Sequence, residues 1–325
     1  MTVKVVKNRI PDTEMMRDVY IQNLIELAKK DKNIVVLDAD LMHSNATHKF
    51  LKEFPDRTIN VGVQEANMIG IAGGLSATGK IPFTHTFACF NTRRALDQIY
   101  ISIAYAQLNA KLIGTDPGIT ASYNGGTHMP LEDVGIMRGI PNMTIVEPVD
   151  NVMMKGILKD IAYTYGPFYV RVSRKFPVKI YEEGSTFEIG KGIILRNGKD
   201  VTIIASGIMV AEALDAADIL EKEGIDARVV NIFTIKPIDR ELITLCAEET
   251  GAVVTAENHN IHNGLGSAVA EVLVENCPVP MERVGVLDLF GEVGSVDYLK
   301  KRFQLTSNDI VKSVKKVLSR KKRCM

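Results

Sequence analysis

The sequence predicts an α/β protein made of two consecutive three-layer α/β domains with mainly parallel sheets. Short apolar strands alternate with amphipathic helices along the whole chain. The 325 residues are enough for two domains with large cores. A polar stretch containing proline and glycine, at 176–188, interrupts the alternation and is interpreted as a linker. We therefore expect the domains at 1–180 and 190–325.

The first half shows the alternation clearly. Short apolar or β-branched runs predict strands at 34–37, 58–61, 81–86, 111–115, 143–146 and 168–172. Helical spacing of apolar residues predicts a first helix covering Met16 to Ala28 and further helices at 65–78, 91–110, 132–138 and 150–165. The segment 116–129 is rich in Gly, Ser, Asn and Thr and is expected to be a long irregular loop, a kind of loop that is usually functional.

The second half repeats the pattern. Strands are expected at 192–195, 201–205, 227–230, 252–256 and 284–286. Helices are expected at 209–223, 239–250, 266–274 and 307–318. Strands joined by helices pair in parallel, so the carboxyl ends of the strands should meet at one edge of each sheet, where such sheets bind their ligands.

Composition excludes several classes of protein. The formal net charge is zero, so no overall field favours nucleic acid or a membrane. The four cysteines are scattered without a C-x-x-C pair, which argues against a zinc site or a disulfide framework and suits the cytoplasm. The start of the chain lacks a signal-peptide core, and no apolar run reaches the roughly 18 residues of a membrane span. We expect a cytoplasmic protein.

Two nucleotide-binding motifs can also be set aside. Residues 74–80 match the first seven positions of a P-loop, but Ile81 stands where Ser or Thr is required. That stretch also ends a helix instead of opening one, so a helix C-cap explains it better. No G-x-G-x-x-G opens a helix after a strand, which argues against a Rossmann dinucleotide site.

The stretch from Thr58 to Phe90 places a carboxylate and aromatic rings at the ends of two neighbouring strands. Glu65 stands at the mouth of a helix built from small residues, and the strand 81–86 leads directly into Phe87 and Phe90. Taken alone, Glu65 could be a first-turn acid favoured by the helix dipole, and the two phenylalanines could be core residues. Their placement at strand ends favours a ligand site.

A series of motifs in the same order resembles the C-terminal half of a transketolase, over essentially the whole chain. The series consists of Arg17, Asp38-Ala39-Asp40-Leu41, Ser44-Asn45, Gly62-Val63-Gln64-Glu65, Thr86-Phe87-x-x-Phe90, Gly125-Gly126-Thr127-His128-x-Pro130, and Ser173-Arg174. The resemblance implies a pyrimidine-binding domain for thiamine diphosphate (ThDP), followed by a transketolase C-terminal domain.

The resemblance also implies roles for the cofactor-facing residues. Glu65 would be catalytic, hydrogen-bonding N1′ of the aminopyrimidine and so favouring the tautomer that activates the thiazolium. Phe90 would stack on the pyrimidine with Phe87 beside it, and Asp40 would lie near the thiazolium.

The implied substrate-binding residues are mostly cationic or polar. Arg17, Ser44 and Arg174 match the groups that hold the phosphate of a sugar substrate, a task suited to the guanidinium fork. His128 matches a catalytic histidine that contacts the oxygens of the donor.

Two positions depart from the family pattern. Asp116 stands where a phosphate-contacting histidine is expected, and Asn124 stands where an aspartate would bind the ketose hydroxyls. An aspartate repels a phosphate, so the substrate at Asp116 and Asn124 could be a modified sugar, or one with another anion in place of phosphate.

The sequence contains no Gly-Asp-Gly, the motif that holds Mg²⁺ and the ThDP diphosphate in this family. The resemblance therefore implies one subunit of a split transketolase, active only with an N-terminal subunit that carries Gly-Asp-Gly. A homodimer of this chain within a heterotetramer is the expected assembly, and transfer of a two-carbon ketol unit to an aldose is the expected reaction. The alternatives are the β subunit of a 2-oxo-acid dehydrogenase E1 component, half of a deoxyxylulose-phosphate synthase, or a non-catalytic partner subunit.

Overall fold

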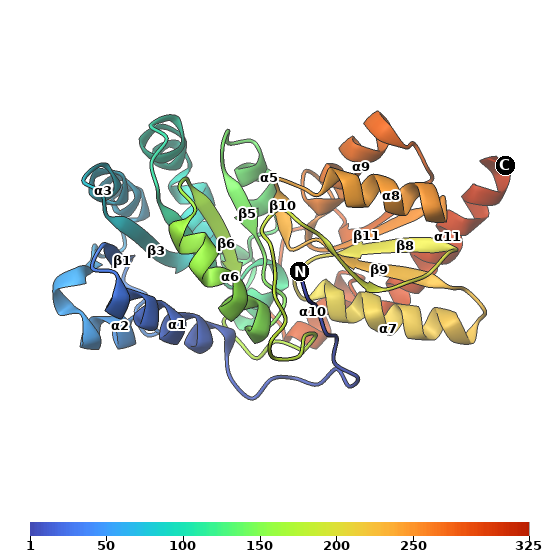
Figure 1. Cartoon of the computed structure of the whole chain (residues 1–325), viewed down its shortest axis with the longest axis horizontal. Coiled ribbons are helices and arrows are strands. Elements are labelled where there is room, and N and C mark those ends of the chain that lie inside the picture. The colour runs from blue at the N-terminus through green and yellow to red at the C-terminus, as the bar shows by residue number, and fades with distance from the viewer. Residues whose placement is uncertain (325) are drawn as a thin grey trace.

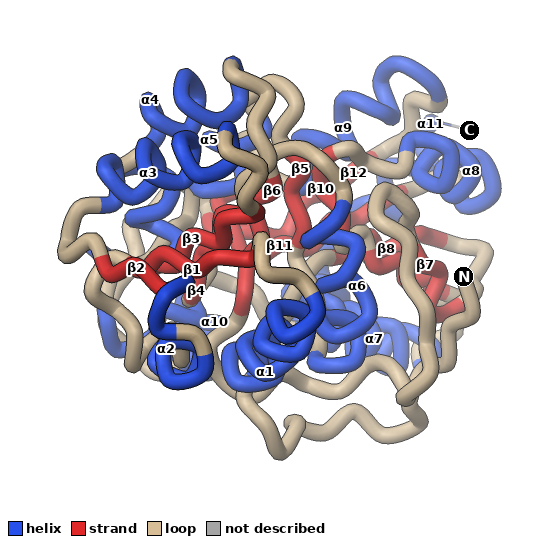
Figure 2. The backbone as a smooth tube through the Cα atoms, turned by 60° about the vertical axis from the view of Figure 1, so that its left-hand side comes forward, coloured by secondary structure: helices blue, strands red, loops and turns tan. Residues whose placement is uncertain are grey.

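Two sheets organise the computed structural model, which describes residues 1–324 (Figure 1). Their strands run through the middle of the molecule, with helices around them (Figure 2). Buried apolar residues fill both faces of the first sheet and form further packing around the second. None of the described helices is long and apolar enough to cross a membrane. The expected fold class, two α/β domains with mostly parallel sheets, is confirmed.

The first sheet has seven strands in the order β10-β5-β6-β4-β3-β1-β2. All neighbours are parallel except β10. The strands are β1 Ile34–Asp38, β2 Thr58–Asn60, β3 Ile81–Phe87, β4 Lys111–Thr115, β5 Thr144–Val146, β6 Phe168–Val172 and β10 Thr234–Lys236. The α-helices of this half are α1 Met16–Lys30, α2 His48–Glu53, α3 Glu65–Ala77, α4 Leu96–Gln98, α5 Asp133–Arg138 and α6 Asn151–Tyr163.

The second sheet has five strands in the order β12-β11-β8-β9-β7, and only β7 runs antiparallel to its neighbour. The strands are β7 Ile193–Arg196, β8 Val201–Ala205, β9 Ala227–Asn231, β11 Val253–Asn260 and β12 Met281–Val286. The helices are α7 Met209–Lys222, α8 Arg240–Thr250, α9 Leu265–Asn276, α10 Val296–Arg302 and α11 Ser307–Cys324.

Two expectations about the first half need correction. The helix expected at 91–110 is present from Phe90 to Tyr105, but it is mostly π-helical, over η2 Phe90–Arg94 and η3 Ile99–Tyr105, where backbone hydrogen bonds span five residues instead of four. The loop 116–129 is not irregular. It forms short 3₁₀ turns, η4 Gly118–Asn124, which is kinked at Ser122, and η5 Gly126–His128, since much of it is buried and its backbone groups need partners.

The segment beyond the linker also contributes to the first sheet. β10, which the sequence did not predict, pairs antiparallel with β5 and extends that sheet by one strand. The N-terminal residues run alongside the linker, with bridges joining Val5 to Tyr181 and Pro11 to Val178. Pairing of this kind fixes the two halves of the chain against one another.

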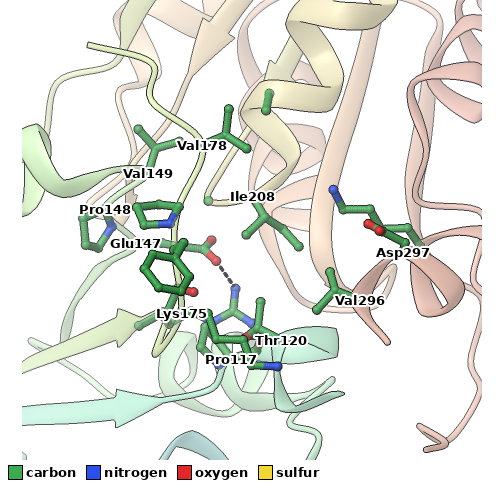
Figure 3. Close-up of a pocket in the computed structure, with 17 residues that line it drawn as sticks. Pro117, Thr120, Glu147, Pro148, Val149, Lys175, Val178, Ile208, Val296 and Asp297 are labelled. Atoms are coloured by element: carbon green, nitrogen blue, oxygen red, sulfur yellow. Dashed lines mark hydrogen bonds and ion pairs between the residues drawn. The ribbon is translucent and has the colours of Figure 1, made fainter. Parts of the chain in front are cut away.

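A buried guanidinium joins the two domains. Arg171 on β6 is 1% exposed and donates from Nε and Nη2 to the carboxylate of Asp133, at 2.9 and 3.2 Å. Its Nη1 donates to Glu147 Oε1 at 2.7 Å, the bond drawn as a dashed line in Figure 3, and Nη2 also donates to the carbonyl of Asn258 on β11 at 3.0 Å. Glu147 in turn accepts a bond from Ser206 of the second domain. One cation therefore balances two acids that are buried away from solvent.

Removal of this cation should destabilise the protein strongly. We expect Arg171→Met to lower the free energy of unfolding in urea by ~3–5 kcal/mol, because Asp133 and Glu147 would stay buried without a counter-charge. Arg240→Met, which breaks the exposed ion pair with Glu275, should cost no more than ~1 kcal/mol. Equal effects of the two substitutions would show that Arg171 is not needed to balance the buried acids.

Candidate active site

The carboxyl ends of β1, β3, β4 and β6 meet at one edge of the first sheet, because these four strands are adjacent and parallel. The chain leaves β1 through Asp40 and β4 through Asp116, and both aspartates have left-handed backbones, with φ of 62° and 56°. Such a conformation costs energy in any residue other than glycine, although aspartate tolerates it better than most. Phe87 ends β3, and Arg174 follows β6 by two residues.

Glu65 lies at the mouth of α3, and its two carboxylate oxygens have different surroundings. The side chain is 1% exposed. Its Oε1 accepts a bond from Arg94 Nη1 at 2.8 Å, whereas its buried Oε2 has no partner among the described residues. A buried oxygen without a donor is costly, so the arrangement fits a group from outside this part of the chain that donates to Oε2.

Three rings gather beside Glu65. The ring centroid of His128 lies 5.1 Å from that of Phe90 and 5.9 Å from that of Phe87, with edge-on geometry in both cases. The Arg94 guanidinium carbon lies 3.8 Å from the Phe90 centroid, so the arginine that pairs with Glu65 also covers one face of Phe90. Phe87 is buried, while Phe90 is partly exposed and can offer a surface to a ligand.

At the other end of the group, Arg174 is paired with Asp116. Its Nη2 lies 2.7 Å from Asp116 Oδ2 and its Nε donates to Oδ1 at 3.1 Å, a two-bond contact. Asn124 Nδ2 donates to the same Oδ2 at 3.4 Å. Burial raises the pKa of Asp116, and the positive charges of Arg174, Lys175 and Arg17 act against that rise. Arg174 also lies over Phe87, at 5.3 Å from the ring centroid, which joins this pair to the aromatic group.

Arg17 and Ser44 are in contact, but through a backbone group. Arg17 Nη1 donates to the carbonyl of Ser44 at 2.7 Å, and the serine hydroxyl takes no part in that bond. The buried Arg17 Nε has no acceptor among the described residues, so it remains a donor for an outside group. Asp40 is exposed and accepts a weak bond from Asn60 at 3.3 Å.

The structure therefore brings most of the expected residues to one sheet edge. Glu65, Phe87, Phe90 and His128 form one contiguous group, and Asp116, Asn124 and Arg174 form a second group that touches it through Phe87. Asp40 and Ser44 line a separate hollow of about 340 Å³ after β1, together with His43, His48 and Asn60.

Sequence reasoning missed Arg94 and Arg93. Arg94 contacts both Glu65 and Phe90, and Arg93 pairs with Glu132 at 2.9 Å and donates to the carbonyl of Thr127. A signal is present in the sequence, because the two arginines follow Phe90 within four residues. It does not reveal where they point, because their direction depends on the π-helical turn.

The cavity in Figure 3 adjoins the pair of Asp116 and Arg174. It measures about 310 Å³ and opens between the two domains. Pro117 and Lys175, the neighbours of the pair along the chain, line one side, and Ile208 and Val296 of the second domain line the other. The second domain also holds the loop after β4, because Asn258 donates to the carbonyl of Pro117 at 2.9 Å. A Cβ at Gly118 would lie 2.2 Å from the Asn258 side chain, so this approach requires glycine.

Comparisons with known proteins agree on one family. Residues 13–176 match the model of the transketolase pyrimidine binding domain, and 190–310 match that of the transketolase C-terminal domain. The 6-deoxy-6-sulfo-D-fructose transketolase subunit SqwH of Clostridium sp. (strain MSTE9) is 55% identical over 94% of this chain and 95% of that protein. A putative transketolase C-terminal section of Methanocaldococcus jannaschii is 47% identical over 92% of this chain and 95% of that protein. A solved split-gene transketolase, described as an inactive β4 tetramer, has a TM-score of 0.86 at 46% identity and covers 94% of this chain and 98% of that chain.

The two matched domains define a class of protein, the half of a ThDP-dependent enzyme that carries the pyrimidine-binding domain. The chain belongs to the transketolase family. The resemblance drawn from the sequence motifs is thereby confirmed at the level of family.

The ion pair at Asp116 should make one substitution depend on pH. We expect Arg174→Met to cost ~2 kcal/mol of unfolding free energy at pH 8, because it leaves a buried carboxylate without its cation. When the pKa of an acid is higher in the folded than in the unfolded protein, the protein loses stability as the pH rises from the unfolded-state pKa to the folded-state pKa. Burial already raises the pKa of Asp116, and loss of the cation raises it further, so the cost should be smaller at pH 5 than at pH 8. Urea titrations at both pH values measure this difference.

The matched control is the double variant Arg174→Met with Asp116→Asn, which removes both charges. Its stability relative to Asp116→Asn alone should not depend on pH. A pH dependence that persists in the double variant would show that another group causes it.

Proposed function

We propose that this chain is the C-terminal subunit of a two-chain transketolase that transfers a two-carbon ketol unit from a ketose to an aldose with ThDP. The observation that carries the proposal is the buried Oε2 of Glu65, which has no partner among the described residues although Oε1 is held by Arg94. A carboxylate at the mouth of a helix, beside an exposed aromatic surface, suits the aminopyrimidine of that cofactor.

The residues of this chain would bind the cofactor and the sugar and would orient them. When bound, ThDP supplies the electron sink that allows the bond between C2 and C3 of a ketose to break. Glu65 Oε2 would share a proton with the pyrimidine nitrogen N1′, in surroundings dry enough to strengthen that bond. Phe90, with Phe87 beside it, would fix the plane of the ring. Asp40 would face the thiazolium. His128 would donate to the oxygens of the sugar near the reacting carbons.

The proposed donor is a ketose with an anionic group at its far end. Arg17, whose buried Nε lacks an acceptor among the described residues, and Arg174 would bind that end. The name of the Clostridium relative specifies 6-deoxy-6-sulfo-D-fructose, which supports a sulfonated ketose among the candidates. The other candidate is a sugar phosphate. It would be bound by Arg17, Ser44, Arg174 and the neighbouring Asn124.

The proposed partner is an N-terminal transketolase subunit with a Gly-Asp-Gly motif that holds Mg²⁺ and the diphosphate. The relative described as a C-terminal section and the split-gene structure support a two-chain enzyme, and the tetramer of the latter supports association between copies of this chain. Large apolar side chains are exposed along α3 and its neighbour η3: Val63 before α3, and Tyr100, Ile101 and Tyr105 on η3, which packs on α3 around Gly73. We place the partner on this surface.

Loss of the carboxylate charge should abolish turnover without unfolding the chain. We expect Glu65→Gln in the assembled enzyme to lower kcat by ~10²–10⁴-fold, because an amide cannot share a proton with N1′ in the same way. Its unfolding free energy should stay within ~1 kcal/mol of the wild type, since Arg94 keeps an oxygen to bind. Asp160→Asn, at an exposed acid on α6, serves as the control and should leave kcat unchanged. Near-normal turnover by Glu65→Gln would refute the assignment.

A partner bound on this surface should make the effects of two substitutions at Gly74 differ. Gly74 lies inside α3, is exposed, and has nothing within 4 Å of the position of a Cβ. Gly74→Ala and Gly74→Leu should both stabilise the isolated chain by ~0.5–1 kcal/mol, through better helix propensity. Only the leucine is bulky enough to block a closely packed subunit. We therefore expect only Gly74→Leu to lower the affinity for the partner, measured by calorimetry, by about tenfold or more. Wild-type affinity for Gly74→Leu would move the interface elsewhere.

A further inference from the structure

Arg94 contacts both of the groups that are proposed to hold the aminopyrimidine ring. Its Nη1 donates to Glu65 Oε1 at 2.8 Å, and its guanidinium carbon lies 3.8 Å from the centroid of the Phe90 ring. The guanidinium is flat and delocalised, so it stacks well on an aromatic face. A single flat group of this chain therefore bridges the acid and the ring face.

An aminopyrimidine has the same two properties as this guanidinium. It is flat enough to stack on an aromatic ring, and its protonated ring nitrogen donates to a carboxylate. A ligand that binds Glu65 and Phe90 together therefore needs the space that the guanidinium fills. The other oxygen of Glu65 is closed off as well, because Oε2 is buried and the side chain is only 1% exposed. A molecule from outside reaches this acid only after a side chain has moved.

Arg94 is the member of this group that can move. Its side chain is 45% exposed, whereas Glu65 is buried. Arg94 also lines an open groove of about 590 Å³, and Asp97, an exposed acid, lines the same groove. Because both residues face one groove, the guanidinium can turn from the carboxylate of Glu65 to that of Asp97. Arg94 thus has a second anionic partner away from Phe90.

We propose that Arg94 holds the aminopyrimidine site closed and is displaced when the cofactor ring binds, turning from Glu65 to Asp97. The inference rests on the proposed function, because it takes the aminopyrimidine as the ligand of Glu65 and Phe90. In the closed arrangement, the arginine gives a buried carboxylate its counter-charge, without which the acid would be costly to bury. A competing side chain lowers the apparent affinity for the ring in proportion to the fraction of molecules whose site is open.

The first test uses the ring alone, 4-amino-2-methylpyrimidine, and the isolated full chain, with dissociation constants from NMR titrations. This probe has no diphosphate, so loss of an arginine charge cannot weaken its binding through the phosphates. We expect Arg94→Ala to bind the ring ~5–20-fold more tightly than the wild type, since the ion pair and the stacking contact no longer compete. Equal or weaker binding by Arg94→Ala would overturn the inference, and weaker binding would show that Arg94 helps to hold the ring.

The matched control is Arg302→Ala in the second domain. Arg302 is 43% exposed, pairs with Glu292 at 3.2 Å and lies 5.4 Å from the ring centroid of Phe303, so it combines an acid and a ring as Arg94 does. This substitution should leave the dissociation constant of the ring unchanged. A gain in Arg302→Ala equal to that in Arg94→Ala would attribute the effect to the loss of a positive charge and refute the displacement.

Asp97→Asn should act in the opposite direction to Arg94→Ala. It removes the second acid available to the displaced guanidinium, so the closed arrangement gains population and the ring should bind ~2–5-fold more weakly. Unchanged or tighter binding by Asp97→Asn would contradict the proposed movement toward that acid.

A second measurement follows Arg94 itself in the wild-type chain. With ¹³C-labelled arginine, the side-chain hydrogens of an arginine stacked on an aromatic ring resonate upfield of their ordinary range. Arg94→Lys identifies the signal and keeps a positive charge beside Glu65. Saturation with 4-amino-2-methylpyrimidine should move the Arg94 signal to the ordinary range. A signal that stays upfield at saturation would mean that the arginine is not displaced.

Comparison of ring binding with turnover separates this inference from the proposed function. If Arg94→Ala tightens ring binding but the enzyme assembled from both subunits transfers no ketol unit from any ketose, the proposed reaction is wrong and the displacement stands. If ketol transfer occurs and Arg94→Ala does not tighten ring binding, the reaction stands and the displacement is wrong. Absence of ring binding by both the wild type and Arg94→Ala would also refute the displacement.

Discussion

The buried Arg171 guanidinium is the interaction on which the site depends most. It binds Asp133 at the start of α5, Glu147 after β5 and the carbonyl of Asn258 on β11. Arg174 lies three residues further along the same strand end, and the Asn258 side chain holds Pro117 next to Asp116. The second domain therefore fixes both partners of the ion pair between Asp116 and Arg174. The second domain thus sets the geometry of this ion pair, because a buried cation with two buried acids favours one arrangement.

The hydrogen bonds of Glu65 indicate that the described chain forms only part of the site. Glu65 satisfies one oxygen within the chain and leaves the other buried without a donor among the described residues. A protein that completed the site alone would not keep such an oxygen, since the cost of an unpaired buried group is of order 1–3 kcal/mol. The exposed apolar residues of η3 lie along the helix that Glu65 begins, where Gly73 of α3 approaches Ser102 of η3. The face of α3 and η3 can thus receive another subunit.

The sequence was sufficient for the fold class and for residues that follow strands, because alternation of strands and helices dictates a parallel sheet whose carboxyl ends coincide. Glu65 and Phe87 were found for this reason, whereas Asp116 and Arg174 were found through the resemblance to the family pattern. It was insufficient for Arg94, whose direction depends on a π-helical turn without a periodic signature, and for β10, a three-residue strand supplied across the linker. The contact between Arg17 and Ser44 uses a carbonyl oxygen, which every residue possesses and which no side-chain pattern can indicate.

The unpaired groups also differ in chemistry, so the two ends of the site require different groups from a ligand. At one end, Glu65 has an acceptor that lacks a donor in the described chain, and at the other end Arg17 has a donor that lacks an acceptor there. The rings of Phe87, Phe90 and His128 separate these two ends. Molecules that satisfy both ends must place a hydrogen-bond donor at Glu65 and an anion at Arg17, which is the arrangement that an aminopyrimidine and an anionic sugar would adopt together. At that second end, the carboxylate of Asp116 already occupies Nε and Nη2 of Arg174. The two ends of the site therefore depend on two different carboxylates, Glu65 and Asp116, and a change at Asp116 leaves the bond between Glu65 and Arg94 in place.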